Sequence, residues 1–143
     1  MCYTCNSTGS CAPVPGARRF HVDKYGYLNT TEEMQQEMYA NGPIVCSMYS
    51  HTSPWHCYNG TGVIQDNTTF ADTTHVISLL GWGVEDGVDY WLGRHSGGTT
   101  WGDEGYFKIQ RGINTLGIEQ HCGFATVADP FPTRNQSQIT CEG

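Results

Sequence analysis

Two histidines follow a pattern that could place an imidazole at the edge of a cleft. His75 begins a short apolar run that continues to Gly83, and His95 comes shortly after a second run at Tyr90–Leu92. An imidazole exchanges a proton close to neutral pH, so either side chain could act as a general acid or base. On spacing alone, a structural histidine whose hydrogen bonds are satisfied is the more common case. The pattern by itself leaves both interpretations open.

The elements around the two histidines read as an antiparallel meander. The run His75–Gly83 predicts a buried strand, and Glu85–Gly87 supplies a hairpin turn. Tyr90–Leu92 then returns as the partner strand and delivers the second histidine at its end. A glycine-rich loop at 97–102 leads to a third strand at Gly105–Ile109.

A short helix is expected before this meander. Thr30 and Glu33 fit a capping box, and Gly42-Pro43 ends the apolar pattern, so the prediction is a helix over 31–41. The segment Ile44–Met48 follows as a strand.

Composition limits the class of protein. A chain of 143 residues can build one substantial core, so we predict a single domain over 1–143 with a C-terminal tail at 130–143. Hydrophobic residues make up 38%, charged residues 15%, and there are 18 glycines, which favours a loop-rich β-containing domain. The net charge of -7 argues against nucleic-acid binding, and no apolar run is long enough to span a bilayer.

Seven cysteines indicate an oxidising compartment. Cys2, Cys5 and Cys11 form a C-x-x-C-x5-C cluster within residues 1–20, which are rich in Gly, Pro and Ser. A zinc site would need a second half-site, and a redox C-x-x-C would need a βαβ context, so we favour a loop stapled by local disulfides. Met1 is not followed by a signal-peptide pattern, and we expect that it is not the start of the gene product.

Acceptor motifs for N-glycosylation point to the same compartment. The N-x-[ST] pattern occurs five times, more often than chance predicts, at Asn6, Asn29, Asn59, Asn67 and Asn135. The sequence therefore predicts a glycoprotein of the secretory pathway, either extracellular or lysosomal/vacuolar.

Three segments in order resemble one protein family. They are Thr74–Gly83, Asp89–Leu92 and Ser96–Ile109, and they resemble the C-terminal half of papain-family cysteine proteases. Further segments are similar to the cathepsin X group within that family, namely Cys2–Cys5 with Cys11, Met38–Cys46 and Leu116–Cys122. The resemblance implies an α+β, mainly β fold: the right-hand antiparallel β-barrel-like domain of the papain-like fold, with one short helix.

The resemblance also implies roles for single residues. His75 matches the catalytic histidine, which in this family keeps a cysteine thiol ionised and later protonates the leaving amine. His95 stands where the family has the asparagine that orients the ring. Gly98 stands where the family has a tryptophan that covers that hydrogen bond, and Trp101 matches a second, supporting tryptophan. Two imidazolium groups would repel, and a glycine would open the bond to water, so we expect inefficient catalysis.

No segment of the chain matches the one that carries the family's catalytic cysteine. Cys11 follows Gly9-Ser10, but Ala12-Pro13 comes next instead of an aromatic residue and a helix. The resemblance makes Cys11 a structural cysteine and implies disulfides Cys5–Cys11 and Cys46–Cys122. An odd set of three remains, Cys2, Cys57 and Cys141, so one of them is free or bonds another chain.

Two hypotheses for function follow, and both make this chain inactive on its own. In the first, the domain is a pseudoprotease that serves as a glycosylated structural or interaction module. In the second, it is the histidine-bearing chain of a processed two-chain cathepsin X-like protease. An unrelated disulfide-rich binding domain is a weaker third. Neither a cofactor nor a metal is expected.

A protein partner is expected under both main hypotheses. It is either a left-domain chain with the catalytic cysteine or neighbours in an assembly. The face with His75, His95 and Trp101 should contact that partner, and the glycosylation sites Asn29, Asn59 and Asn67 should lie elsewhere.

Overall fold

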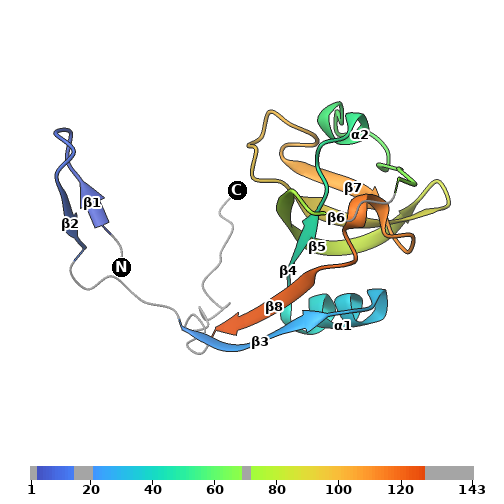
Figure 1. Ribbon diagram of the computed structural model, residues 1–143, viewed down its shortest axis with the longest axis horizontal. Coiled ribbons are helices and arrows are strands. Elements are labelled where there is room, and N and C mark those ends of the chain that lie inside the picture. The colour runs from blue at the N-terminus through green and yellow to red at the C-terminus, as the bar shows by residue number, and fades with distance from the viewer. Residues whose placement is uncertain (1–2, 15–20, 69–71, 128–143) are drawn as a thin grey trace, which may run out of the picture. The chain divides into compact units, whose positions relative to one another are not determined.

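A computed structural model describes residues 3–14, 21–68 and 72–127 (Figure 1). The chain divides into two compact units, Met1–Lys24 with Thr126–Gly143, and Tyr25–Ala125. The single domain expected over 1–143 stays a prediction, and the tail at 130–143 lies outside the described residues.

The smaller unit contains a β-hairpin where the sequence predicted a stapled loop. Strands β1 (Tyr3–Cys5) and β2 (Cys11–Pro13) pair in antiparallel register, and Cys5 lies opposite Cys11. The expected disulfide joins these two residues. At the turn, Oδ1 of Asn6 accepts hydrogen bonds from the backbone N–H and the hydroxyl of Thr8.

The larger unit is built on a sheet of six strands. Their order is β3 (Val22–Leu28), β8 (Cys122–Val127), β4 (Ile44–Met48), β5 (His75–Glu85), β6 (Val88–Arg94) and β7 (Tyr106–Gln110). The predicted meander is present as β5–β6–β7, and the mainly β class is confirmed. The sheet does not close into a barrel, because β3 and β7 lie at opposite ends of the order and leave it open.

The β5–β6 hairpin turns where the sequence placed it. Asp86 and Gly87 have φ of 51° and 79°. Two successive positive φ values characterise the type I′ turn that Asp-Gly favours, and its twist matches that of the flanking strands. Both strands are longer than predicted, because regular pairing continues up to the turn from Glu85 and Val88.

Helix α1 (Thr31–Asn41) has the predicted bounds. The Thr30 hydroxyl accepts the Glu33 N–H at 3.1 Å, and the Glu33 carboxylate accepts the Asn29 N–H at 2.7 Å. Gly42, with φ of 99°, ends the helix in a conformation that residues with a side chain rarely adopt.

The expectation of one helix was incomplete. A four-residue helix α2 (Ser53–His56) and a 3-10 turn η1 (Thr115–Gly117) are also present. Both are too short for a hydrophobic period to predict. In the described part of the chain, no helix, α1 included, has the length and apolar character to cross a membrane.

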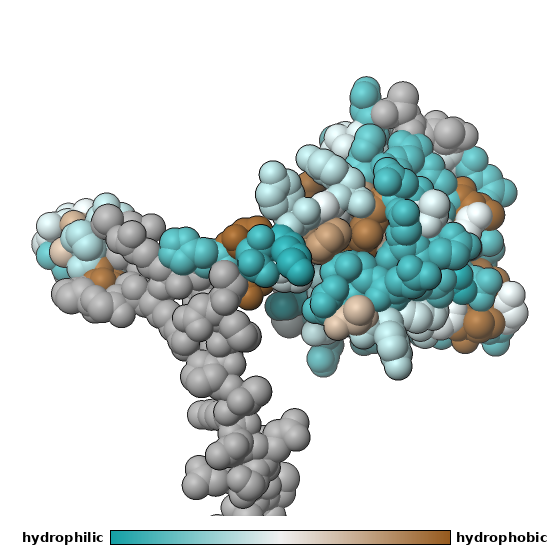
Figure 2. Space-filling model, turned by 90° about the horizontal axis from the view of Figure 1, so that it is seen from below, coloured by the Kyte–Doolittle hydropathy of each residue, from teal (hydrophilic) through white to brown (hydrophobic). Residues whose placement is uncertain are grey.

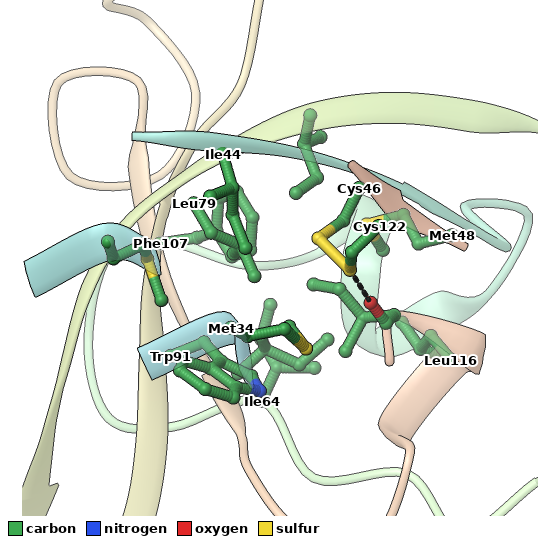
Figure 3. Close-up of a cluster of buried hydrophobic side chains, with 14 of the residues drawn as sticks. Met34, Ile44, Cys46, Met48, Ile64, Leu79, Trp91, Phe107, Leu116 and Cys122 are labelled. Atoms are coloured by element: carbon green, nitrogen blue, oxygen red, sulfur yellow. Dashed lines mark hydrogen bonds between the residues drawn. A yellow bond between two sulfur atoms is a disulfide. The ribbon is translucent and has the colours of Figure 1, made fainter. Parts of the chain in front are cut away.

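The core lies between the sheet, α1 and η1 (Figure 3). Strand β4 alternates buried and more exposed residues, so Ile44, Cys46 and Met48 point inward. Cys46 pairs with Cys122 across β4 and β8, and the expected disulfide joins them inside the core. The fully buried large side chains include Trp91, Phe107, Met34, Leu79, Ile109 and Leu116.

The face of the larger unit seen in Figure 2 is mainly hydrophilic, with scattered apolar side chains.

Candidate active site

His75 is the first residue of β5, and the end of β4 fixes its backbone. It pairs with Met48, whose carbonyl accepts the Thr74 N–H at 2.9 Å. The Thr74 hydroxyl in turn accepts the Ser50 N–H at 3.0 Å. These bonds tie the residue before His75 to the end of β4, so the half-buried imidazole of His75 is attached to a well-anchored backbone.

His95 follows the last residue of β6. Its backbone N–H donates to the Gly105 carbonyl at 2.8 Å, and the Gly105 N–H donates to the Trp101 carbonyl at 2.8 Å. Gly105 has φ of 91°, and a Cβ there would lie 3.2 Å from the Gly98 carbonyl oxygen. The glycine-rich loop can therefore close on itself and bring Trp101 back to His95.

The structure brings the two histidines together. Nε2 of His75 lies 2.8 Å from Nδ1 of His95, within hydrogen-bond distance. One ring must donate and the other must accept. When His75 donates from Nε2, its Nδ1 is the nitrogen left to exchange a proton with another group.

Burial sets the charge of this pair. It lowers the pKa of both imidazoles from 6.5, and the neighbouring His95 lowers that of His75 further. Both shifts favour the neutral rings, in which one lone pair accepts the shared proton. If both rings were cations, two N–H groups would face each other and the bond would be lost.

Two tryptophans pack against the histidines. The predicted Trp101 contacts the His95 ring, with ring centroids 4.7 Å apart. Trp55 contacts both imidazoles, at 5.8 Å from His75 and 5.3 Å from His95. Sequence reasoning missed Trp55. The available signal was Ser53-Pro54 just before it, because proline is favoured in the first turn of a helix.

The prediction that Gly98 stands at the family's tryptophan position is wrong by one residue. In the family motif N-S-W-G-x-x-W-G, His95 at the asparagine and Trp101 at the second tryptophan put the missing tryptophan at Gly97. A Cβ at Gly97 would clash with the imidazole of His95, so that ring occupies the space where a side chain would begin. At Gly98, with φ of 93°, a Cβ would meet nothing within 4 Å. A cavity of about 600 Å³ lies beside His95, with Val76, Arg94 and Gly98 in its lining. The prediction considered the tryptophan position alone, and so it did not anticipate an aromatic ring that reaches the histidine pair from another segment.

The remaining predicted site residues lie as follows. Cys11 is in a disulfide, as expected of a structural cysteine, and Cys57 is free and exposed. Cys2 and Cys141 lie outside the described residues. The acceptor asparagines Asn6, Asn29, Asn59 and Asn67 are all exposed, and Asn135 lies outside the described residues. Over residues 3–14, 21–68 and 72–127, no group of three His, Cys, Asp or Glu side chains is placed to hold a metal ion.

Comparison with known proteins identifies the family. The model for papain family cysteine proteases matches residues 1–128. A "Cysteine protease" of Blomia tropicalis is 37% identical over 82% of this chain and 36% of its own length. A "Cathepsin Z" of Onchocerca volvulus is 38% identical over 76% of this chain and 37% of its own length.

Solved structures agree with this assignment. A structure solved to explain limited antibody cross-reactivity between the mite allergens Blo t 1 and Der p 1 has a TM-score of 0.70 at 34% identity, covering 76% of this chain and 36% of that one. Digestive procathepsin L2 of Tenebrio molitor has a TM-score of 0.70 at 32% identity, covering 82% and 38%. The chain thus spans little more than a third of the length of these relatives. It belongs to the papain family of cysteine proteases.

Proposed function

We propose that this chain supplies the histidine side of a cathepsin Z-like cysteine protease active site. The observation that carries the proposal is the 2.8 Å contact between Nε2 of His75 and Nδ1 of His95, which leaves Nδ1 of His75 to act on a thiol. The cysteine would come from a separate left-domain segment, which docks on the face with His75, His95 and Trp101. By itself, the 143-residue chain has no peptidase activity.

The histidine pair suits one proton transfer. His75 would accept the thiol proton at Nδ1 and become an imidazolium, while its Nε2–H donates to the neutral Nδ1 of His95. The thiolate would then attack the scissile carbonyl, and His75 would return the proton to the leaving amine. His95 replaces the amide oxygen of the family's asparagine as long as it stays neutral, and its lowered pKa favours that state.

A second candidate is a pseudoprotease that serves as a glycosylated interaction module. The residues that favour it are His95 and Gly97, which stand where the family has the asparagine and the tryptophan that support the catalytic histidine. A protonated imidazole has no lone pair left to accept a hydrogen bond, whereas an amide oxygen stays an acceptor. In both cases we propose a protein of the secretory pathway, because five acceptor motifs and two disulfides suit an oxidising compartment.

The experiment is active-site labelling of the protein as purified from its source, together with any chain that accompanies it. A peptidyl epoxide that alkylates papain-type thiols is added, and mass spectrometry locates the modified cysteine. We expect one cysteine of a left-domain segment to be labelled. His75→Ala should abolish labelling, whereas His121→Ala, which alters an exposed histidine, should not.

The outcomes separate the two candidates. Labelling that depends on His75 supports the protease half-site. A left-domain partner that binds but carries no reactive cysteine supports the pseudoprotease. Stoichiometric labelling of Cys57 or Cys11 in the isolated chain, with peptide cleavage, would refute both.

A further inference from the structure

Trp55 is the aromatic residue best placed to cover the bond between the histidines. Only 3% of its surface is exposed. Its ring meets that of His95 at 86° and that of His75 at 62°, both in edge-to-face arrangements. It therefore contacts both partners of the 2.8 Å hydrogen bond, whereas the contact of Trp101 is with His95.

Short-range structure holds this ring in place. Helix α2 is a single turn, closed by hydrogen bonds from the His56 N–H to the Thr52 carbonyl at 3.0 Å and from the Cys57 N–H to the Ser53 carbonyl at 2.9 Å. Pro54 lies in the first turn of this helix, where its ring fixes φ. The direction in which the Trp55 side chain leaves the backbone is therefore set locally.

Tertiary packing fixes the ring from two further sides. Trp101 lies 4.5 Å from the Trp55 ring in a tilted stack, and Phe107 lies 5.0 Å away at 78°. Phe107 belongs to β7, and it is 1% exposed. Because both neighbours are held by the sheet and the glycine-rich loop, the indole cannot swing away from the histidines without opening the core.

We propose that Trp55 is a positioning residue that covers the His75–His95 hydrogen bond and takes the place of the tryptophan missing at Gly97. Its effect on catalysis rests on the proposed function, whereas its effect on the bond does not. Excluding water from one side of a hydrogen bond lowers the local dielectric constant and strengthens the bond. The covering side chain thus comes from the segment after β4 instead of the loop that carries His95.

The test uses nitrogen-15 NMR of the histidine rings in the 143-residue chain. In the wild type we expect a protected imidazole N–H signal from the shared proton, and nuclear Overhauser contacts from the Trp55 indole to carbon-bound protons of both histidines. Trp55→Leu keeps apolar bulk but removes the ring. It should lose the protected signal and move the pKa of both histidines up toward 6.5, since burial is the first cause that lowers them.

Two further variants separate positioning from general stability. Trp55→Phe should restore the protected signal in part, because a ring again covers the bond. Trp82→Leu removes a partly exposed tryptophan of β5 whose contact is with Trp91, and it should leave both histidine rings unchanged.

The inference is overturned if Trp55→Leu folds and keeps the protected proton and both pKa values. It is also overturned if the wild-type indole shows no Overhauser contact to the histidines, a measurement that holds even if the variant fails to fold. Failure of cysteine labelling would instead refute the proposed function and leave this result intact.

Discussion

The carboxylate of Glu119 should be the polar group on which the loop after β7 depends most. Its Oε1 accepts the indole N–H of Trp91 at 2.8 Å and the backbone N–H of Gly112 at 2.7 Å. Its Oε2 accepts the Asn114 N–H at 2.8 Å. Trp91 is fully buried, so removing the acceptor leaves its N–H without this protein partner.

The cost of losing this group can be estimated from these contacts. Leaving a buried donor without a partner costs about 1–3 kcal/mol, and a hydrogen bond to a charged acceptor contributes about 1.5–3 kcal/mol. Gly112 is exposed and can bond water instead, which reduces its share. We therefore expect Glu119→Ala to lower the free energy of unfolding by about 3 kcal/mol. Glu119→Gln should cost about half as much, because its oxygen can still accept from Trp91.

Loss of the Glu119 carboxylate should also affect the candidate active site, through backbone hydrogen bonds. The carbonyl of Leu116, in the turn that Glu119 closes, accepts the Tyr49 N–H at 2.8 Å. Tyr49 directly follows β4, beside the Ser50–Thr74 bond that precedes His75. Loosening this turn should therefore also broaden the NMR signals of His75.

Urea unfolding followed by far-UV circular dichroism measures the stability change. The matched control is Glu104→Gln, which removes an exposed carboxylate two residues before β7 and should change the free energy of unfolding by less than about 0.5 kcal/mol. If Glu119→Ala and Glu104→Gln unfold at the same urea concentration, the assigned role of the carboxylate is wrong.

Three other outcomes are expected. Because the pKa values of His75 and His95 are lowered on folding, the unfolded chain takes up protons first as the pH falls below 6.5. Stability should fall in that range and level off below the folded pKa values, and urea titrations of a His75→Gln/His95→Gln variant should show a flatter pH dependence than the wild type. Replacing the Cys46–Cys122 disulfide, which spans 76 residues, with two alanines should cost about 4.5 kcal/mol on chain-entropy grounds, and a loss below about 1 kcal/mol would contradict that account. Light scattering should find the protein bound to a partner and Trp101→Asp unbound, whereas equal monomers at high concentration would contradict a docking face there.

The sequence predicted those elements whose signals are local. Strand β4 has its predicted bounds because alternation places Ile44, Cys46 and Met48 on one buried face. Helix α1 has its predicted bounds because the Thr30 cap and Gly42 mark both ends. The disulfides required the family resemblance, since spacing alone leaves the pairing of seven cysteines open.

The elements that were missed depend on distant partners. Strand β3 is exposed along most of its length, so its hydrophobic pattern carries little information, and it pairs with β8 at the other end of the described chain. The N–H of Lys24 bonds the hydroxyl of Thr126, 102 positions away. Trp55 was missed for a related reason: its position against the histidines is decided by tertiary contacts with Trp101 and Phe107.

Compared one position at a time with the family motif, His95 and Gly97 are two separate defects. The structure relates both positions to a third, because the His95 ring packs against Trp55 and occupies the space beside Gly97 where a Cβ would lie. A neutral imidazole can accept the hydrogen bond that an amide oxygen would accept, provided that the ring stays uncharged. Burial beneath an indole is a physical means of keeping it so, because desolvation disfavours the cation. A change at any one of the three positions should therefore alter the effect of the others, since residues in direct contact contribute non-additively.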